Sequence, residues 1–486
     1  MCRVVFIRYA KWRIHCMDGR KKKSKYTNKK NEYNVLLPEE SSDEVLESSE
    51  ESDEILRSSQ EFDELIEPLK ISSELSDKNK FIYENSLLIF ERTITTAAQI
   101  TVENYYKRAL IHFKFENYNA AITDLDEAIK IEKKYADAYN LRGMSFSKLN
   151  KYNEAIEEFN QASKIDLCNN DPIFNRGCIY EDYYNDTKKA IADYKKAILI
   201  NPKSESAAKA YYRLGLISYK KNKKKTAMQR FTLAISIDKD FAETYLVQGN
   251  LYFEMGKTKQ ALINYIIAIK LKPDYIEAYI SRAALFIKEK RISDAIEDYS
   301  TIISIDPYYP EIRLNRAICY LKQNKQFDAF ADLCVAIKLK PTLPTAHFLR
   351  GKIYWKIKNY SNALLDLNEA NQLNPDDPSI YLYRASVYRK MGKLDLAFDE
   401  VNKAISFKPT PQAYQARGVI HYQSNRIREA LIDLNRALES KPGFKNAIKH
   451  LENILNNLTL SNIDSVPLLY RSIKKLPHIK QIPLFK

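Results

Sequence analysis

Apolar residues recur along the middle of this 486-residue chain at the three- and four-residue spacings typical of helices. The segment 278–307, AYISRAALFIKEKRISDAIEDYSTIISIDP, contains two such stretches, separated by the polar sequence KEKR. Pro307 closes the second stretch, as prolines commonly do just after a helix. The pattern therefore predicts two amphipathic helices joined by a short turn.

The same pattern recurs ten times between residues 102 and 444, mostly at intervals of 34 residues. Such a period is typical of architectures in which small helical or strand units stack on one another. With Ala136 as position 1 of the second copy, position 8 is always glycine or alanine, and position 27 is alanine except at Ile302. Residues this small allow two helix axes to approach closely, so that larger neighbouring side chains interlock. Position 20 is alanine in every copy: Ala121, Ala155, Ala190, Ala227, Ala261, Ala295, Ala329, Ala363, Ala397 and Ala430.

Proline stands at position 32 in seven copies, where it would end the second helix of the unit. Together with the small residues at positions 8, 20 and 27, this column resembles the tetratricopeptide repeat (TPR), a helix-turn-helix unit of 34 residues. The resemblance covers residues 102–444. It implies an all-α fold, a right-handed superhelix (α-solenoid) whose first helices line a concave groove, and a role as a scaffold that binds segments of other proteins.

The segments beside the repeats differ strongly in charge, although the whole chain has a net charge of +15. Residues 1–32 contain eleven Lys and Arg against two acids, whereas residues 33–80 contain fifteen Asp and Glu against four Lys and Arg. The acidic segment is rich in serine and repeats DEVL, DEIL and DELI every ten residues, so we expect it to be too highly charged to form a core. The sequence predicts six parts: a basic N-terminal tail (1–32), an acidic, serine-rich disordered segment (33–80), a lead-in helix (81–101), ten repeats (102–444), a C-terminal capping helix (445–458) and a basic C-terminal tail (459–486).

An arginine at position 7 accompanies an acid at position 23 in eight of the ten copies, whereas the fourth and fifth copies lack both. Two residues that are lost together within one copy are expected to touch within it, because a guanidinium and a carboxylate form strong paired hydrogen bonds. We therefore expect an arginine–carboxylate pair between the two helices of each such copy. These arginines would then be structural and would not form a ladder for phosphates. The expected pairs include Arg282 with Asp298, Arg316 with Asp332, and Arg350 with Asp366.

The fourth copy departs most from the pattern, because it follows an extended junction and carries a strongly basic turn. Departures from an otherwise regular pattern are expected at functional sites, so we expect a partner to bind there. Part of this region is similar to the clamp with which some tetratricopeptide domains hold the C-terminal carboxylates of heat-shock chaperones. Three of its five positions match, whereas Asn140 and Met144 occupy the other two and do not match. The candidate partner-binding residues are Asn175, Lys209 and Arg213, which are the matching positions, and Lys220, Lys221, Lys223, Lys224 and Lys225 in the turn.

These features predict a non-enzymatic protein-interaction scaffold without a cofactor. The chain has ten glycines but no phosphate-binding loop, and its histidines and cysteines show no metal-ligand spacing. No apolar run approaches the ~20 residues that cross a bilayer. The expected partners are other proteins that present acidic or C-terminal peptide segments. The expected location is the cytoplasm, with the nucleus as the alternative that the basic tail 1–32 favours.

Three alternatives remain open at this point. The partial clamp would make the protein a chaperone adaptor. The basic repeats could bind RNA, but base-reading repeats need stacking or amide side chains in register, and position 5 here is mixed. The acidic segment 33–80 could fold back onto the basic repeats of its own chain, because the two carry opposite charge.

Overall fold

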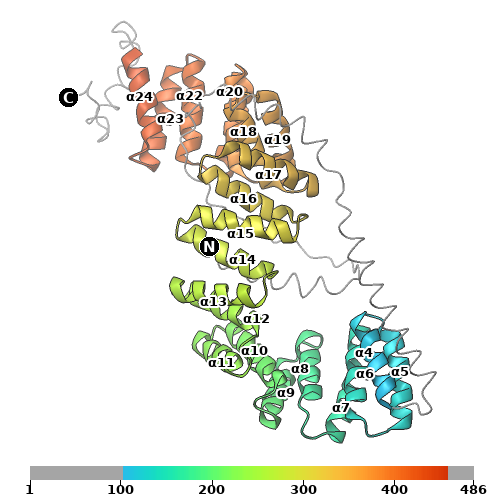
Figure 1. The fold of residues 1–486 in the computed structure, drawn as a ribbon. Coiled ribbons are helices and arrows are strands. Elements are labelled where there is room, and N and C mark those ends of the chain that lie inside the picture. Colours follow the sequence, from blue (N-terminus) through green and yellow to red (C-terminus); the bar gives the residue numbers. More distant parts are fainter. Residues whose placement is uncertain (1–101, 458–486) are drawn as a thin grey trace. The chain divides into compact units, whose positions relative to one another are not determined.

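The computed structural model describes residues 102–457, and within them the chain forms 21 α-helices, α4 to α24 (Figure 1). Twenty of these helices follow one another along the chain as ten pairs in sequence, two helices for each copy of the pattern. The expected tails, acidic segment and lead-in helix lie outside the described residues. From the first repeat to the tenth, the pairs are α4 (Val102–Lys114) and α5 (Tyr118–Ile131), α6 (Ala136–Lys148) and α7 (Tyr152–Ile165), α8 (Asp171–Asp182) and α9 (Thr187–Ile200), α10 (Glu205–Lys220) and α11 (Lys224–Ile237), α12 (Ala242–Glu254) and α13 (Thr258–Leu271), α14 (Ile276–Lys288) and α15 (Ile292–Ile305), α16 (Pro310–Lys322) and α17 (Gln326–Leu339), α18 (Pro344–Lys356) and α19 (Tyr360–Leu373), α20 (Pro378–Lys390) and α21 (Leu394–Phe407), and α22 (Pro411–Gln423) and α23 (Ile427–Ser440).

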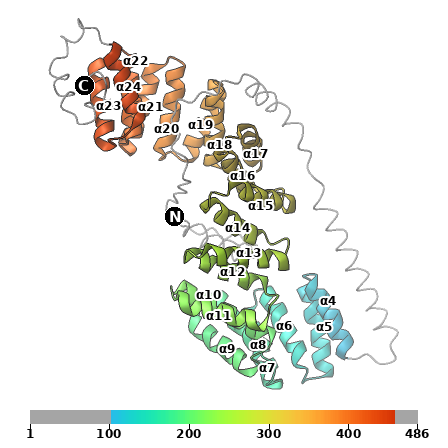
Figure 2. The same ribbon diagram turned by 60° about the vertical axis from the view of Figure 1, so that its left-hand side comes forward.

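The described residues divide into two compact units, 102–392 and 393–457. The first unit contains α4 to α20, and the second contains α21 to α24 (Lys445–Asn457). Within each unit, every helix packs against the helices before and after it in sequence, so that the pairs form a stack (Figure 2). The chain is therefore an all-α array of paired helices, which confirms the fold class expected from the sequence.

The turn between the two helices of each repeat depends on one residue with a positive φ angle. In the second repeat this residue is Asn150, with φ of 64°, and in the fifth it is Gly256, with φ of 74°. Asparagine and glycine adopt this left-handed conformation more readily than other residues, which explains why most of these turns contain one of them. Such a residue occurs in all ten repeats: Glu116, Asn150, Asn185, Asn222, Gly256, Lys290, Asn324, Lys358, Gly392 and Asn425.

The small residues of the pattern lie at the centre of the packing. Every alanine at position 20, Ala295 among them, has no exposed surface, and the same is true of every residue at position 27. Position 8 faces position 24 of the same repeat. For example, Gly143 lies against the ring of Phe159, and Gly215 lies against the ring of Phe231. The close approach of helices that the small residues predict is therefore present.

Adjacent repeats also contact each other through their first helices. In the first unit α4 contacts α6, α6 contacts α8, α8 contacts α10, and α12 contacts α14. Because first helices approach one another more closely than second helices do, they form the inner side of the row within this unit.

The last helix covers the end of the second unit. Leu451 and Ile454 of α24 are buried in a cluster with Leu434 and Leu438 of α23. The tenth repeat would otherwise expose this apolar face, because no further repeat follows it among the described residues.

Candidate partner-binding surface

The arginines at position 7 lie against the acids at position 23 of the same repeat. In the seventh repeat, Arg316 donates from Nε and Nη2 to the two carboxylate oxygens of Asp332, each at 2.7 Å. This is the bidentate geometry that makes arginine–carboxylate pairs strong. Arg384 and Glu400 of the ninth repeat belong to different units, and their pairing stays a prediction. Within the units, the pairs are Arg108 with Asp124, Arg142 with Glu158, Arg176 with Asp193, Arg282 with Asp298, Arg316 with Asp332, Arg350 with Asp366, and Arg417 with Asp433.

Five of these seven arginines also donate to a side chain of the preceding repeat, a contact that the sequence reasoning missed. Nη1 of Arg142 donates to Asp126 at 2.6 Å, and Nη1 of Arg316 donates to Oγ of Ser300 at 2.9 Å. The acceptor always stands at position 25. Residues that can accept a hydrogen bond recur at that position and could have indicated this contact in the sequence, but the residue type varies from repeat to repeat. The other acceptors of this kind are Asn160 for Arg176, Cys334 for Arg350 and Asn402 for Arg417.

Repeats four and five fill these positions differently. Arg230, at the usual place of the acid, donates to the carbonyl oxygen of Leu214 at 2.7 Å and to Oγ of Ser218 at 2.6 Å. Burial lowers the pKa of Arg230 from its ordinary value. In repeat five, Gln248 instead donates to Oγ1 of Thr232 in repeat four, at 3.1 Å. Hydrogen bonds to neutral groups therefore replace the ion pair in these two repeats.

All three residues that match the clamp interact with other side chains, and for two of them the contact is a weak one. Asn175 in α8 donates from Nδ2 to Oδ1 of Asn140 at 3.1 Å. Lys209 in α10 forms an ion pair at 2.5 Å with Glu205, one helical turn before it. The pair of Lys209 is exposed and of the kind that contributes little, so a ligand could displace it.

Arg213, the third matching residue, is more firmly held. It donates to the two carboxylate oxygens of Asp182 in α8, at 3.0 and 3.1 Å. Glu181 lies beside this pair, 3.7 Å from Arg213 and 3.7 Å from Nζ of Lys220. A carboxylate ligand would have to displace Asp182 from Arg213, which weakens the case for a clamp.

The basic turn between α10 and α11 retains exposed positive charge. Lys224 pairs with Glu254 of α12 at 2.9 Å. Lys221, Lys223 and Lys225 are exposed. These three lysines give repeat four a concentration of positive charge that a negatively charged partner could contact.

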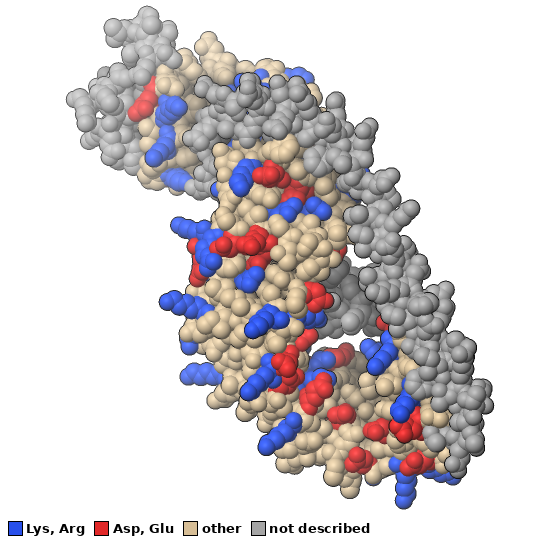
Figure 3. Space-filling model, viewed as in Figure 1, with Lys and Arg blue, Asp and Glu red and all other residues tan. Residues whose placement is uncertain are grey.

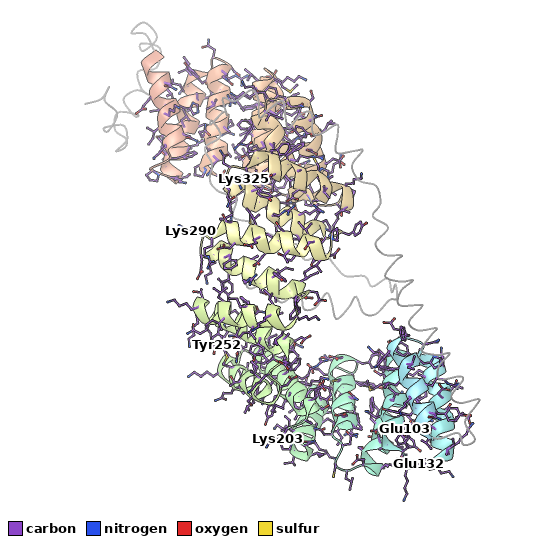
Figure 4. The ribbon with its side chains drawn as sticks, viewed as in Figure 1. Glu103, Glu132, Lys203, Tyr252, Lys290 and Lys325 are labelled. Carbon is purple, nitrogen blue, oxygen red and sulfur yellow. The ribbon has the colours of Figure 1, made fainter. Side chains whose placement is uncertain are left out.

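The opposite end of α10 opens onto a cavity of about 450 Å³. Figure 4 labels Lys203, which lies in the junction before this helix. Three of the lining residues are acids, so the cavity does not extend the basic surface of the turn. The lining residues are Lys203, Glu205, Ile237, Asp238, Lys239 and Asp240.

Comparison with known families supports the sequence pattern directly. A family model described as "TPR repeat" matches residues 249–289. A second, described as "Tetratricopeptide repeat", matches residues 102–135, 136–167, 172–204, 208–241, 344–377 and 411–444. The chain is a tetratricopeptide repeat protein. The resemblance noted from the spaced small residues is confirmed.

Several solved structures are similar to this tetratricopeptide repeat protein. A tetratricopeptide repeat protein from Parabacteroides merdae is 20% identical, with a TM-score of 0.39, over 51% of this chain and 98% of its own. Yeast Tom70 is 14% identical, with a TM-score of 0.35, over 84% of this chain and 100% of its own. The Cut9–Hcn1 hetero-tetramer of the APC/C contains a chain 15% identical, with a TM-score of 0.41, over 77% of this chain and 94% of its own. No curated protein matches the sequence. These similarities concern the fold and identify no partner.

The described part of this tetratricopeptide repeat protein offers no group of three or more His, Cys, Asp or Glu side chains placed to hold a metal ion. None of the described helices combines the length and apolar character needed to cross a bilayer.

We expect His347, which lies beside the Arg350–Asp366 pair, to make the stability of the first unit depend on pH. Nδ1 of His347 lies 3.1 Å from Oδ1 of Asp366, and its Nε2 lies 3.0 Å from the carbonyl oxygen of Pro341. The hydrogen bond to Asp366 raises the pKa of His347 above its ordinary value, although burial and the nearby Arg350 oppose the shift. A raised pKa in the folded state stabilises the fold at pH values below the unfolded pKa of about 6.5, and this stabilisation is lost as pH rises through the folded pKa.

Urea unfolding should therefore show His347→Gln losing more stability near pH 5.5 than near pH 8.5. An equal loss at both pH values would contradict the assignment.

Proposed function

We propose that this tetratricopeptide repeat protein is a non-enzymatic scaffold that binds an acidic segment of a partner protein at repeats three to five. The segment would be extended or helical and would lie in the groove of the first helices. Tetratricopeptide repeat proteins are generally protein–protein interaction scaffolds, and no catalytic domain is found in this one. The proposal includes a cytoplasmic location, with the nucleus as the alternative.

The observation that carries the proposal is the exposed charge of the turn between α10 and α11. Lys221 and Lys223 are exposed, and they follow directly on α10, a first helix that reaches the inner side of the row. Clustered positive charge raises the local concentration of acidic partners and accelerates their association. The repeat to which the turn belongs is also one of the two that lack the arginine–acid pair.

A chaperone adaptor with a carboxylate clamp is the less favoured reading of the same region. It would require Arg213 to leave Asp182, and Asn175 to leave Asn140. A clamp depends on a free terminal carboxylate, whereas the basic turn requires only negative charge. The two readings therefore differ in how they respond to amidation of a peptide's C-terminus.

The proposal is tested with the full chain and a fluorescent twelve-residue peptide of alternating Glu and Ala, prepared with free and amidated C-termini. We expect both forms to bind, with an affinity that falls as salt rises. Replacing Lys221 and Lys223 with glutamate should weaken binding about fivefold to tenfold, because two attractive charges become repulsive. Fluorescence anisotropy gives the affinities.

The matched control is Lys290→Glu with Lys325→Glu, at the turns of repeats six and seven. Figure 4 shows both lysines at the ends of helices, away from repeat four. Both are exposed, and the position of Lys290 is held by Glu116 in repeat one with a similar φ angle. An equal loss of affinity in the control, or no binding of either peptide at low salt, would refute the site. Binding of the free-carboxylate form alone would instead support the clamp.

A further inference from the structure

Three consecutive second helices, α9, α11 and α13, lack the acidic residues that the other second helices carry. The helices α11 and α13 contain no Asp or Glu. The single acid of α9, Asp193, is buried and bonded to Arg176. Every other second helix of the array contains at least two acids. This difference belongs to repeats three, four and five together.

The exposed charge of these three helices is entirely positive. Seven of their lysines are exposed, and Lys189 pairs with Asp186. The other six form no ion pair with any residue in the part of the chain that the structure describes. In Figure 3, blue side chains project from the edge of the molecule that α11 and α13 form. The six lysines are Lys188, Lys195 and Lys196 in α9, Lys225 in α11, and Lys259 and Lys270 in α13.

The same helices expose large apolar side chains between the lysines. Leu199 in α9 is 81% exposed, and Leu233 in α11 is 44% exposed. In α13, Ile263 and Ile266 are 57% and 46% exposed. An isolated exposed apolar residue needs no explanation, but four of them on three successive helices indicate a contact surface.

These residues share one side of the stack. Lys188, Lys225 and Lys259 stand at position 18 of their repeats, and Ile263 and Ile266 stand four and seven residues after Lys259. Residues at such spacings lie on one face of a helix. Figures 1 and 2 both show α9, α11 and α13 following one another along the same side of the first unit. We call these exposed lysines, leucines and isoleucines the outer basic face.

We propose that the acidic segment 33–80 of the same chain docks on the outer basic face. The segment carries fifteen acids, and it repeats a pair of acids followed by a pair of apolar residues every ten residues. Its Asp–Glu pairs would contact the lysines, and its apolar pairs would contact the leucines and isoleucines. Three such motifs match three helices: Asp43-Glu44-Val45-Leu46, Asp53-Glu54-Ile55-Leu56 and Asp63-Glu64-Leu65-Ile66.

The length of the chain permits this contact. The 35 residues 67–101 connect the last motif to α4 and can span at most about 115 Å. Stacked helices lie about 10 Å apart, so this linker is long enough to reach repeats three to five. A ten-residue step between motifs covers about 15 Å if helical and about 33 Å if extended, which suffices to pass from one second helix to the next.

Apolar complementarity favours this occupant over a nucleic acid. Proteins that bind single-stranded nucleic acids usually combine basic residues with exposed aromatic rings on which bases stack. The outer basic face instead exposes aliphatic side chains. The proposal shares Lys225 with the basic turn, but it does not involve Lys221 or Lys223, the two lysines replaced in the test of the partner site, so the two proposals can fail separately.

The test measures lysine accessibility in the full chain. An amine-reactive acetylating reagent is applied at low salt, and the modification of each lysine is quantified by mass spectrometry. The comparison chain has the same length but carries Asp43→Asn, Glu44→Gln, Asp53→Asn, Glu54→Gln, Asp63→Asn and Glu64→Gln. We expect the reactivity of Lys196, Lys259 and Lys270 to rise about threefold or more in this chain, and to rise similarly in the native chain at 1 M salt.

Lys164 in α7 and Lys338 in α17 are matched controls. Both are exposed and stand at position 29, the position of Lys270. Their reactivity should be the same in the two chains. The proposal is overturned if Lys196, Lys259 and Lys270 react equally in both chains, or if the controls change as much as they do, whether or not the face also binds anionic vesicles or RNA.

The apolar part of the proposal has its own test. Ile263→Ser with Ile266→Ser alters two exposed side chains, so the fold should persist. In the native background this double change should raise the labelling of Lys259 and Lys270 about twofold. In the acid-neutralised background it should leave their labelling unchanged. An unchanged result in the native background would exclude the apolar contact.

Discussion

Replacing Asp366 with alanine is expected to lower the free energy of unfolding by about 3–5 kcal/mol, because it leaves the partly buried Arg350 without its counter-ion. Asp366 is only 4% exposed. It accepts two hydrogen bonds from Arg350, both at 2.8 Å, and lies 3.1 Å from Nδ1 of His347. Urea unfolding of the full chain, combined with hydrogen exchange in α18 and α19, measures the loss and shows whether it is centred on repeat eight.

Repeat five provides the matched comparison for this variant. It carries Gln248 and Asn264 where repeat eight carries Arg350 and Asp366, so the fold tolerates a neutral pair. The double variant Arg350→Gln with Asp366→Asn should therefore lose less than Asp366→Ala, about 1–2 kcal/mol, because removing both charges avoids an unpaired one. Glu369→Ala, an exposed acid on the same helix, should have little effect. If the single variant lost no more than the double variant, the carboxylate would not stabilise the repeat in the way proposed.

Replacing Gly215 with alanine is expected to destabilise the fold by about 1–3 kcal/mol, through overpacking. A Cβ atom there would lie 2.4 Å from Cε1 and 2.7 Å from Cδ1 of Phe231, a ring that is only 1% exposed. The direction is informative, because glycine-to-alanine changes inside helices ordinarily stabilise by up to about 1 kcal/mol. Urea unfolding and hydrogen exchange in α10 and α11 measure the change.

A second substitution tests the cause. Repeats one and seven combine alanine at position 8 with leucine at position 24, as Ala109 with Leu125 and Ala317 with Leu333. Adding Phe231→Leu to Gly215→Ala should therefore recover part of the lost stability, although Phe231→Leu alone is destabilising. Strictly additive effects in this double-mutant cycle would show that the two side chains do not clash.

The parts of the fold that follow from the sequence are those in which one residue type serves one purpose in every repeat. Alanine at position 20 is invariant because any larger residue would separate the helices, and each of these alanines is buried. The arginine–acid pair could be anticipated because repeats four and five lack both members together. Its geometry within a repeat, as in Arg316 with Asp332, is the one expected.

The contacts between repeats could not be anticipated in the same way. The acceptor for Nη1 of the arginine is an aspartate in repeat one, an asparagine in repeats two and nine, a serine in repeat six and a cysteine in repeat seven. Many side chains can accept a hydrogen bond, so no single residue type marks the position. The pairing of Arg213 with Asp182 could not be predicted from the sequence either. It depends on the end of α8 at Asp182, and α8 belongs to a repeat of irregular length.

These arginine contacts have a mechanical consequence. Each one fastens a repeat to its predecessor, so pulling on the ends of the first unit would load them in series. At the junction between repeats five and six, the position that should accept from Arg282 is Ile266, which has no hydrogen-bonding group. At this point the junction has only apolar packing, and buried residues of both repeats, such as Tyr265 and Ala283, belong to one hydrophobic cluster. Under tension, we expect the first unit to break first at the junction between repeats five and six, so that repeats six to eight separate together from repeats one to five.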